Sequence, residues 1–470
     1  MRLSRRTNRM KYLAKIKLFS QNHISLVDIL FGLYIFSQTC IYTSWVNNAT
    51  LVLFVVVEML SRRKIRINGY FILEVLFIVY HMIHIGFDIT VMTDVAYDDL
   101  TRVISVLIVN VIYINYHQEK NNIDQILSVY LFALFAAYLL LLYAYANSFS
   151  TRTGEVDLES AVTVFGVIIS GGVSTKVGMG AAVGFFFAFV RYYKRSNLKL
   201  IALSVLFAVE ALFSGTRKVL ILMVATMILV PVFKERRITK QIRNIIIAIV
   251  LIILAYFIAK QIPVINDTII HRLEKLMTFI DTGKGDSSST VRLMLMNKAE
   301  GAMAERPWFG WGLENFRHVF DMGRYHCHNN FYEMLVAGGI VGFIIFYLKY
   351  VLIFIQYIRT KFYLKKEKNL YNKFKGRFSR IKENELDVFY SRCFLLLFIL
   401  MVIMEYWQRT YNQRSMAIIY AMIYAVLLGN RKKAKARIDE TLHKIRIWKY
   451  GITVEADEMD APEEKESQAG

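Results

Sequence analysis

One side chain at the start of a long apolar segment suits acid–base chemistry, and the side chain next to it can orient that group. His328 lies just before that segment, and a helix N-terminus there would disfavour the imidazolium form. A neutral imidazole would then be available to take a proton from a hydroxyl group as a general base. The alternative is a histidine that only caps the helix or donates a hydrogen bond. Asn329 can orient the histidine or a ligand, or serve as the N-cap itself.

Arginines near the same kind of boundary suit anion binding. Arg217 and its neighbour Lys218 stand at the end of an apolar segment, and Arg272 and Arg292 lie in a long, more polar stretch. The planar guanidinium can bind phosphate oxygens in pairs and stays charged at every physiological pH. The alternative for Arg217 and Lys218 is snorkelling at a membrane boundary. For Arg272 and Arg292 it is an ordinary solvated helix face.

Neighbouring motifs do not indicate a metal or nucleotide site. His326, Cys327 and His328 form one short cluster, which lacks the further ligands and the spacing of a zinc site. Gly310 and Gly312 are not a phosphate-binding loop, because no GxxxxGK[ST] pattern follows a strand. We expect the two glycines to provide turn geometry. We therefore predict no metal and no cofactor.

The composition indicates the class of protein that carries these residues. The chain has 470 residues, of which 56 % are hydrophobic and only 20 % are charged, and its mean hydropathy is +0.38. Soluble proteins are less apolar and carry about 25 % charged residues. The sequence therefore predicts an all-α polytopic membrane protein.

Each spanning helix needs about 20 mainly apolar residues. The sequence contains about twelve such segments: 24–42, 46–60, 70–88, 100–116, 123–144, 177–193, 198–213, 217–233, 244–261, 332–358, 387–406 and 414–429. The apolar stretch 160–173 is shorter and has Gly171 and Gly172 near its end, so we interpret it as a re-entrant or interfacial piece.

The net charge of +21 agrees with this map. If the N-terminus is cytoplasmic, most of the Lys and Arg residues fall on the inner side, as the positive-inside rule requires. The inner parts include a basic arm at 1–23, a basic loop at 359–386 and a tail at 430–470, whose residues 431–449 favour a basic helix. Both termini would be cytoplasmic, and nucleic-acid binding loses its main support.

The one long outer segment, 262–331, separates spans 1–9 (24–261) from spans 10–12 (332–429). A connection of this length is usually functional. Helical periodicity predicts a first amphipathic helix at 269–280 and a second at 291–304, which the serines and threonine at 287–290 would cap. We expect both helices to lie against the outer face of the bundle.

Several ionisable residues fall inside or near the predicted spans. Such residues are functional candidates, although a structural ion pair between helices is an equal alternative. Glu210 lies two turns before Arg217 and can line the same cavity. The full set is Asp28, Glu58, Glu74, His81, His84, Asp88, Arg102, Glu210, Arg392 and Glu405.

A series of motifs resembles the O-antigen ligase and polymerase superfamily. The order is Ser214-Gly215-Thr216-Arg217, then a helix bearing Arg292, then P-x-x-G-x-G over 307–312, and then H-N-x(9)-G-x-x-G from His328 to Gly342. The motifs cover roughly 214–342, and the pattern of spans extends the resemblance over most of the chain.

The resemblance implies a multi-pass bacterial plasma-membrane enzyme with a glycosyltransferase C-type fold and its active site on the outer face. It would be an inverting, metal-independent glycosyltransferase whose donor is an oligosaccharide on a polyprenyl (undecaprenyl) pyrophosphate. In this interpretation Arg217 and Arg292 hold the leaving pyrophosphate and His328 is the base. Lys218, Arg272 and Asn329 would bind substrate.

The first expectation is a polymerase that joins lipid-linked repeat units into capsule, exopolysaccharide or O-antigen, with lipid-linked oligosaccharides as both donor and acceptor. The alternative is a ligase that moves a finished glycan to a lipid or a protein. A rival from another class is a twelve-helix polysaccharide transporter or flippase, which the absence of an internal repeat makes less favourable.

Overall fold

In the computed structural model, the ends of the chain and parts of three long connections fall outside the described residues. The structure describes residues 15–16, 24–41, 43–62, 65–145, 162–164, 167–169, 174–214, 216–235, 237–261, 266, 287–322, 325–374 and 381–450. Helices make up 85 % of them. The predicted all-α class is therefore confirmed.

Most helices among the described residues follow one another with short connections, and the two longest connections are 145–173 and 262–286. They are α2 (Leu26–Cys40), α3 (Ser44–Arg62), α4 (Gly69–Gly86), α5 (Thr93–Lys120), α6 (Ile123–Ala144), α7 (Ser174–Arg195), α8 (Leu198–Phe213), α9 (Arg217–Lys234), α10 (Ile238–Gln261), α13 (Ser287–Glu305), α14 (Asn315–Val319), α15 (Asn330–Lys373), α16 (Ile381–Glu405) and α17 (Arg414–Tyr450).

Each of the twelve predicted spans coincides with one of these helices; only α13 and α14 lie outside that set. Within the described ranges, six helices are long and apolar enough to cross a membrane: α3, α4, α6, α10, α15 and α16. The shorter helix α2 is also apolar. The chain is thus a helical, multi-pass membrane protein.

Polar side chains at the helix starts define where several helices begin. Asn68, Asn122 and Asn197 each accept a hydrogen bond from a backbone amide in the first turn of α4, α6 and α8. Ser25 and Asp28 form a reciprocal capping box at the start of α2. These contacts satisfy amides that have no partner within their own helix.

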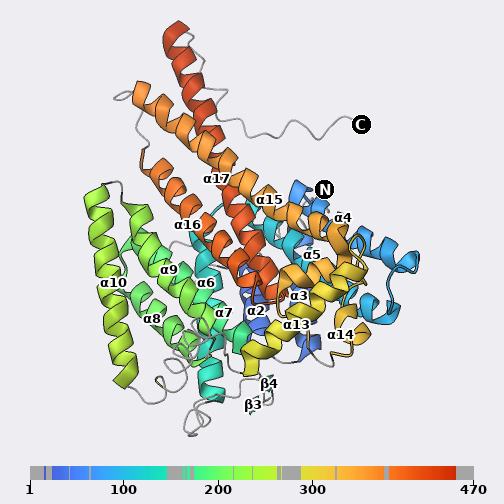
Figure 1. Ribbon diagram of the computed structural model, residues 1–470. Helices are drawn as coiled ribbons and strands as arrows, with labels where there is room; N and C mark the ends of the chain where they lie inside the picture. The colour runs from blue at the N-terminus through green and yellow to red at the C-terminus, as the bar shows by residue number, and fades with distance from the viewer. Residues whose placement is uncertain are drawn as a thin grey trace.

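Helix α17 lies at the centre of the bundle, where it packs against α5 and α15 (Figure 1). Its residues 416–428 are buried almost without interruption. Helices α2, α3 and α6 pack together beside it, and α7 packs against α8 and α9. Helix α10 packs on α9 at the edge of the bundle, and most of its apolar side chains are exposed, as suits contact with lipid.

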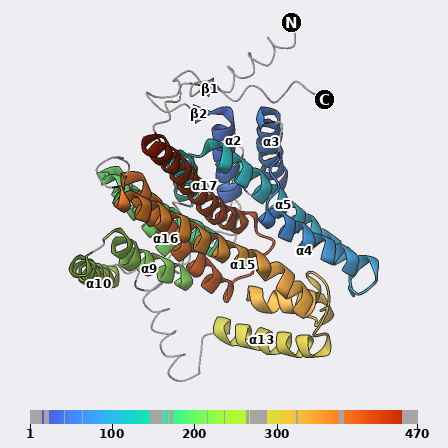
Figure 2. The ribbon, with the colours of Figure 1, turned by 90° about the horizontal axis from the view of Figure 1, so that it is seen from above.

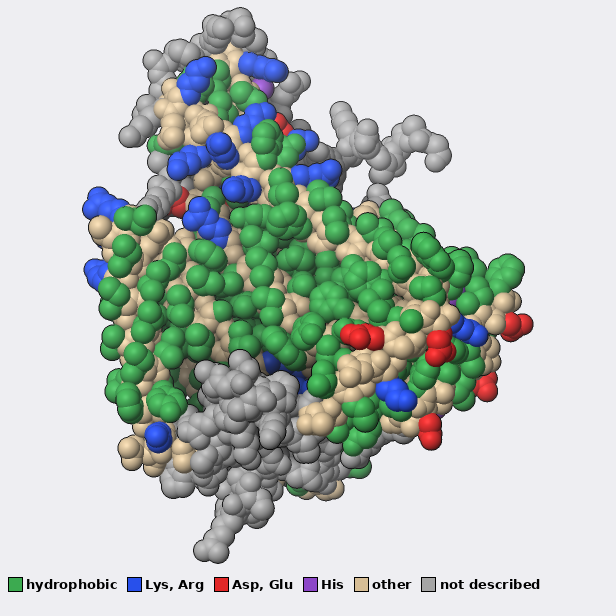
Figure 3. Space-filling view, viewed as in Figure 1, with side chains coloured by type: hydrophobic (Ala, Val, Ile, Leu, Met, Phe, Trp, Pro, Cys, Tyr) green, Lys and Arg blue, Asp and Glu red, His purple; other side chains and the backbone are tan. Residues whose placement is uncertain are grey.

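The surface is divided into an apolar belt and a basic end (Figure 3). Lys and Arg side chains gather over the projecting ends of α15, α16 and α17. Arg437 of α17 joins Glu367 of α15 at 2.6 Å and Asp387 of α16 at 2.7 Å at this end. Helices α13 and α14 lie at the opposite end (Figure 1). The charge asymmetry follows the prediction from the sequence.

The helices differ from the predictions chiefly in their ends. Helix α15 continues to Lys373 and α16 begins at Ile381, so most of the predicted basic loop 359–386 is helical. Span 414–429 and the basic tail helix form one continuous helix, α17. Helix α13 starts at Ser287, so the residues that we expected to cap it lie in its first turn. The predicted helix at 269–280 lies outside the described residues.

Part of the stretch 160–173 forms a short hairpin rather than a helix. Strands β3 (Val162–Val164) and β4 (Val167–Ile169) pair antiparallel, and Ile169 also forms a bridge with Ile41. Alternation of Val with Thr and Ile in this stretch favours strand over helix. A second antiparallel pair joins β1 (Lys15–Ile16) to β2 (Ile24–Ser25).

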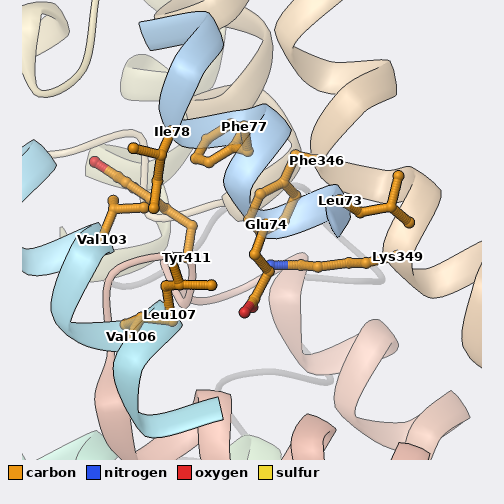
Figure 4. Close-up of a pocket in the computed structure, with 10 residues that line it drawn as sticks. All are labelled: Leu73, Glu74, Phe77, Ile78, Val103, Val106, Leu107, Phe346, Lys349 and Tyr411. Atoms are coloured by element: carbon orange, nitrogen blue, oxygen red, sulfur yellow. The ribbon is translucent and has the colours of Figure 1, made fainter. Parts of the chain in front are cut away.

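Glu74, one of the ionisable residues within the predicted spans, forms a structural ion pair. Glu74 of α4 lies 3.8 Å from the ammonium of Lys349 on α15 (Figure 4). Asn110 of α5 donates a hydrogen bond to the same carboxylate. The Lys349 ammonium also lies 3.8 Å from the centre of the Phe346 ring. For Glu74 the structure therefore shows the ion-pair alternative.

Candidate functional site

Helix α13 lies beside the N-terminal part of α15 (Figures 1 and 2). A separate apolar cluster joins Leu295 and Ala299 of α13 to Phe316 of α14, Cys327 and Val336. Trp311 donates its indole N–H to the backbone oxygen of Ala302 at 2.8 Å. Helices α13 and α14 are thus packed into one unit with the start of α15.

The two glycines of P-x-x-G-x-G allow the backbone of this loop to lie in contact with a break in α15. Gly310 and Gly312 have φ angles of 71° and 100°, which confirms that they provide turn geometry. A Cβ on Gly310 would overlap the backbone oxygen of Val336. The break is at Gly339, where φ is 62° and ψ is −165°.

The loop replaces the hydrogen bonds that the break removes. In an unbroken helix the amides of Ile340 and Val341 would bond to the carbonyls of Val336 and Ala337. Here those two amides donate to the carbonyls of Pro307 and Trp308 at 2.8 and 3.2 Å. In turn, the carbonyls of Val336 and Ala337 accept from the amides of Trp311 and Gly312 at 2.8 and 2.9 Å.

The second glycine of G-x-x-G, which has no side chain, leaves space for a tyrosine ring from another helix. Tyr80 of α4 packs on Gly342, where a Cβ would meet its ring at 2.8 Å. The Tyr80 hydroxyl donates to the backbone oxygen of Gly338 at 2.5 Å. Motif positions Gly310, Gly339 and Gly342 therefore build the support for the start of α15.

His328 lies at that start in a conformation unusual for its residue type. Its φ is 53°, in the left-handed region, where non-glycine residues are uncommon and often functional. The ring is half-buried. Burial, together with the positive charges of Arg292, Lys218 and Arg409 and the neighbouring His326, lowers the pKa of His328 to about 4. The imidazole is therefore neutral at physiological pH, as a general base must be.

Asn329 is the N-cap of α15. Its Oδ1 accepts from the amides of Phe331 at 2.9 Å and Tyr332 at 3.3 Å. The side chain is buried, and its Nδ2 has no hydrogen-bond partner among the described residues. The N-cap alternative is thus confirmed, and one donor of the same amide is left for a ligand.

The cationic residues predicted from the sequence meet in part around His328. Lys218, in the first turn of α9, donates to Gln408 Oε1 at 2.7 Å and to the backbone oxygen of Trp407 at 3.3 Å. Arg292 is exposed on α13, close enough for its charge to act on His328. Arg217 is the first residue of α9. Arg272 lies outside the described residues.

Arg409 joins this group, although the sequence analysis did not single it out. It lies between α16 and α17, and its Nη1 donates to Glu314 and to His326 Nδ1. Burial raises the pKa of Glu314, but contacts with His326 and Arg409 outweigh it and hold that pKa at about 2. The scarcity of basic residues on the predicted outer side is the signal that could have identified Arg409.

A carboxylate at the end of α16 connects the loop of Arg409 to α15. Glu405 is fully buried and accepts hydrogen bonds from Thr410 at 2.6 Å and Asn330 at 3.2 Å. Three tyrosine hydroxyls also donate to it: those of Tyr347, Tyr350 and Tyr420. Asn330 directly follows the N-cap, so Glu405 fixes Arg409 relative to His328.

One group of side chains has the composition of a metal site. The nearest ligand atoms of Glu314, His326 and Glu333 lie within 4.8 Å of one another. Arg409 already supplies the positive charge beside two of them. The third, Glu333, accepts from the backbone amide of Cys327 at 3.1 Å. Each member of the group therefore has at least one contact within the protein.

Comparison with known proteins agrees with the motifs. The family model Wzy_C, described as O-antigen ligase, matches residues 202–347. This range runs from α8 into the first part of α15 and contains Lys218, Arg292, His328 and Asn329. None of the curated proteins compared with the chain matches it.

Proposed function

We propose that this multi-pass membrane enzyme of the O-antigen ligase and polymerase superfamily extends a surface polysaccharide by joining repeat units carried on polyprenyl pyrophosphate. Its substrates as a member of that superfamily are lipid-linked glycans. The observation that carries the proposal is the place of His328 at the start of α15, where burial and the charges of Arg292, Lys218 and Arg409 lower the pKa of its imidazole. The hydroxyl nucleophile needs a base to take its proton, and the anionic leaving group needs cations to stabilise its charge.

In the proposed reaction, the acceptor sugar hydroxyl attacks the anomeric carbon of the donor. His328 takes the hydroxyl proton, and the bond from the anomeric carbon to the pyrophosphate oxygen breaks as the new glycosidic bond forms. Attack from the face opposite the leaving group inverts the anomeric centre. Arg217, Arg292 and Lys218 stabilise the negative charge that develops on the pyrophosphate.

Donor binding would also strengthen the base. The positive charges around His328 lower its pKa in the free enzyme. A bound pyrophosphate neutralises those charges and therefore raises the pKa of the imidazole. The histidine becomes a better proton acceptor only when a donor is in place. Asn329 Nδ2 and Arg272 are proposed to contact substrate.

We further propose the complete arrangement of the chain. Twelve helices form spans in a glycosyltransferase C-type fold, with residues 1–23 and 430–470 in the cytoplasm. Residues 262–331 form the extracytoplasmic catalytic unit between the spans in 24–261 and those in 332–429. The basic end of the molecule in Figure 3 supports this orientation, because Lys and Arg favour the cytoplasmic side.

A ligase that transfers a finished glycan to a lipid or protein is the second candidate, which the description of the matching family model favours. Purified protein in liposomes, supplied with labelled lipid-linked oligosaccharide, separates the two. A ladder of extended lipid-linked products supports polymerisation, and one transfer to an added lipid or protein acceptor supports ligation. Movement of intact label across the bilayer without a new bond would indicate a transporter.

The same assay tests metal independence. In the proposed mechanism the arginines do the work of a metal ion, so transfer should continue in excess chelator. Loss of transfer that Mg²⁺, Mn²⁺ or Zn²⁺ restores would contradict it. An Arg292→Lys variant keeps the charge but not the planar fork, so its KM for the donor should rise.

A further inference from the structure

At the basic end of the molecule, far from the candidate site along α15, a cavity of about 900 Å³ opens between two groups of helices. Helices α7, α9 and α10 form one wall, and α15 and α16 form the other. This volume falls in the range of small-molecule binding sites, about 300–1,000 Å³. Neither the glycan-transfer chemistry nor the motifs of the sequence analysis use it.

The lining of the cavity combines an apolar wall with several cations. Its apolar members are Phe233, Tyr357, Leu364, Leu386, Val388 and Phe389. Its cations are Lys194, Lys234, Lys361, Lys365, Lys368 and Arg392, and its carboxylates are Glu235 and Glu385. Cations therefore outnumber carboxylates in the lining, beside a surface suited to hydrocarbon.

Helix α15 points a continuous face into the cavity. Lys361, Lys365 and Lys368 are spaced four and three residues apart, which places them on one side of the helix. Like charges at this spacing repel one another within a helix. An anion between them would remove that repulsion.

Most of these cations are not neutralised by the protein. Lys194 pairs with Asp124, and Glu235 lies 3.9 Å from Lys240 instead of a lysine of the cavity. Within the described ranges, Lys361, Lys365, Lys368 and Arg392 have no carboxylate at ion-pair distance. The cavity thus presents uncompensated positive charge.

Arg392 makes the strongest case for a ligand. It lies on α16, whose residues 384–405 form a candidate membrane span, and it faces the cavity beside Tyr357. An arginine at the edge of hydrocarbon is costly unless an anion or water meets it. Its planar fork suits two phosphate oxygens.

We propose that this cavity binds an anionic phospholipid of the adjacent leaflet. The phosphate head group lies between Arg392 and the three lysines of α15, and the acyl chains lie along Phe233, Phe389 and Leu364. Basic pockets between spanning helices bind anionic head groups in this manner. The proposal concerns lipid binding and does not depend on the reaction at the other end of the molecule.

The test measures lipid retained by the full-length protein. Wild-type protein is purified in detergent, exposed to mixed micelles of phosphatidylglycerol or phosphatidylcholine, and analysed by native mass spectrometry. The variant Lys361→Gln/Lys365→Gln/Arg392→Gln removes three charges from the cavity. The control Lys366→Gln/Lys435→Gln/Lys373→Gln removes three charges from the basic end outside its lining. Both are compared at matched monodispersity.

We expect wild-type and control protein to retain phosphatidylglycerol in preference to phosphatidylcholine. The cavity variant should bind it about tenfold more weakly, a loss of about 1.4 kcal/mol. Equal binding by cavity variant and control would overturn the proposal. So would equally tight binding of inorganic phosphate, which has no acyl chains, or tighter binding of polyprenyl monophosphate than of phosphatidylglycerol.

Discussion

Asn330 and Glu405, on two different helices, hold the two halves of the candidate site together. Asn330 donates to Glu405 at 3.2 Å, and its Oδ1 accepts from the backbone amides of Thr410 at 2.9 Å and Tyr411 at 3.1 Å. The residue after the N-cap of α15 is thereby joined to the loop that carries Arg409. The side-chain amide of Asn330 therefore bonds both to α16 and to the loop that follows it.

Replacing this amide should destabilise the protein. Asn330→Ala leaves the buried amides of Thr410 and Tyr411 without their acceptor, and each unsatisfied group costs about 1–3 kcal/mol. The temperature of thermal unfolding in detergent should fall clearly below that of wild type. Asn369→Ala, an exposed position on the same helix, is the control and should change little. Equal effects of the two substitutions would show that the network contributes no stability.

Glycines at the break in α15 should not tolerate a methyl group. Gly339→Ala places a side chain in a backbone region that is nearly restricted to glycine, at about 1–3 kcal/mol, and its Cβ would overlap the carbonyl of Trp308. Gly301→Ala in α13 meets nothing within 4 Å and should be neutral or slightly stabilising. Thermal unfolding of the two variants measures the contrast. A stable Gly339→Ala protein would argue against the break.

His328→Ala should abolish most transfer while folded protein and donor affinity remain. His326→Ala, two residues away, should have the milder effect on turnover. The initial rate and donor affinity of monodisperse variants are the quantities to compare. Near-normal turnover by His328→Ala would remove this residue from the mechanism.

The same histidine predicts an unusual pH dependence. Its pKa in the folded protein, about 4, lies below the ordinary value of 6.5. The imidazole should stay unprotonated between these values, so kcat/KM for the donor should fall only as the pH drops well below 6.5. The unfolded chain binds the proton first, so the histidine also makes the folded state lose stability as pH falls from 6.5 towards 4. A kcat/KM that halves near pH 6.5 would contradict this assignment.

Variants of Arg409 and Glu314 can separate the contribution of this buried pair to stability from a contribution of Arg409 to donor binding. Arg409→Gln alone leaves the Glu314 carboxylate buried without its main partner, which typically costs about 3–5 kcal/mol. The double variant Arg409→Gln/Glu314→Gln removes both charges and should recover much of that stability. If Arg409 also stabilises the leaving pyrophosphate, the double variant keeps a raised KM for the donor. Recovery of both stability and KM would limit Arg409 to a structural role.

The orientation of the chain can be tested with single cysteines in a cysteine-free background. Glu305→Cys, at the exposed end of α13, should react with an impermeant thiol reagent in intact cells. Asn369→Cys, on the projecting part of α15, should react only after the membrane is opened. The reverse pattern would invert the proposed topology and place the candidate site in the cytoplasm.

The sequence predicted the helices well because hydropathy reports burial in lipid directly. It also identified Gly310, Gly312 and His328, since their motif has a recognisable local spacing. The helix end at Lys373 and the continuity of span 414–429 with the tail helix at 431–449 were missed, because basic residues continue a helix beyond the membrane without any change in periodicity. These extensions are visible only in the structure.

Contacts between distant parts of the chain were not predictable in the same way. Arg409 binds Glu314 across 95 positions, and neither residue belongs to a motif. Glu405 looked like one of several charges within a span, and its five donors come from α15, α17 and the loop after α16. The partners of Arg409 and Glu405 are determined by how the helices pack, and the periodicity of the sequence carries no information about that packing.

The exchange of hydrogen bonds between residues 307–312 and the break at Gly339 bears on biogenesis. The loop leaves the ribosome before α15 does, and in the proposed topology it would reach its position only after translocation across the membrane. Until then, the amides of Ile340 and Val341 have partners only in a straight helix. In that topology, export of the loop and bending of α15 would be coupled steps, and the candidate site would be completed only in chains that have inserted correctly.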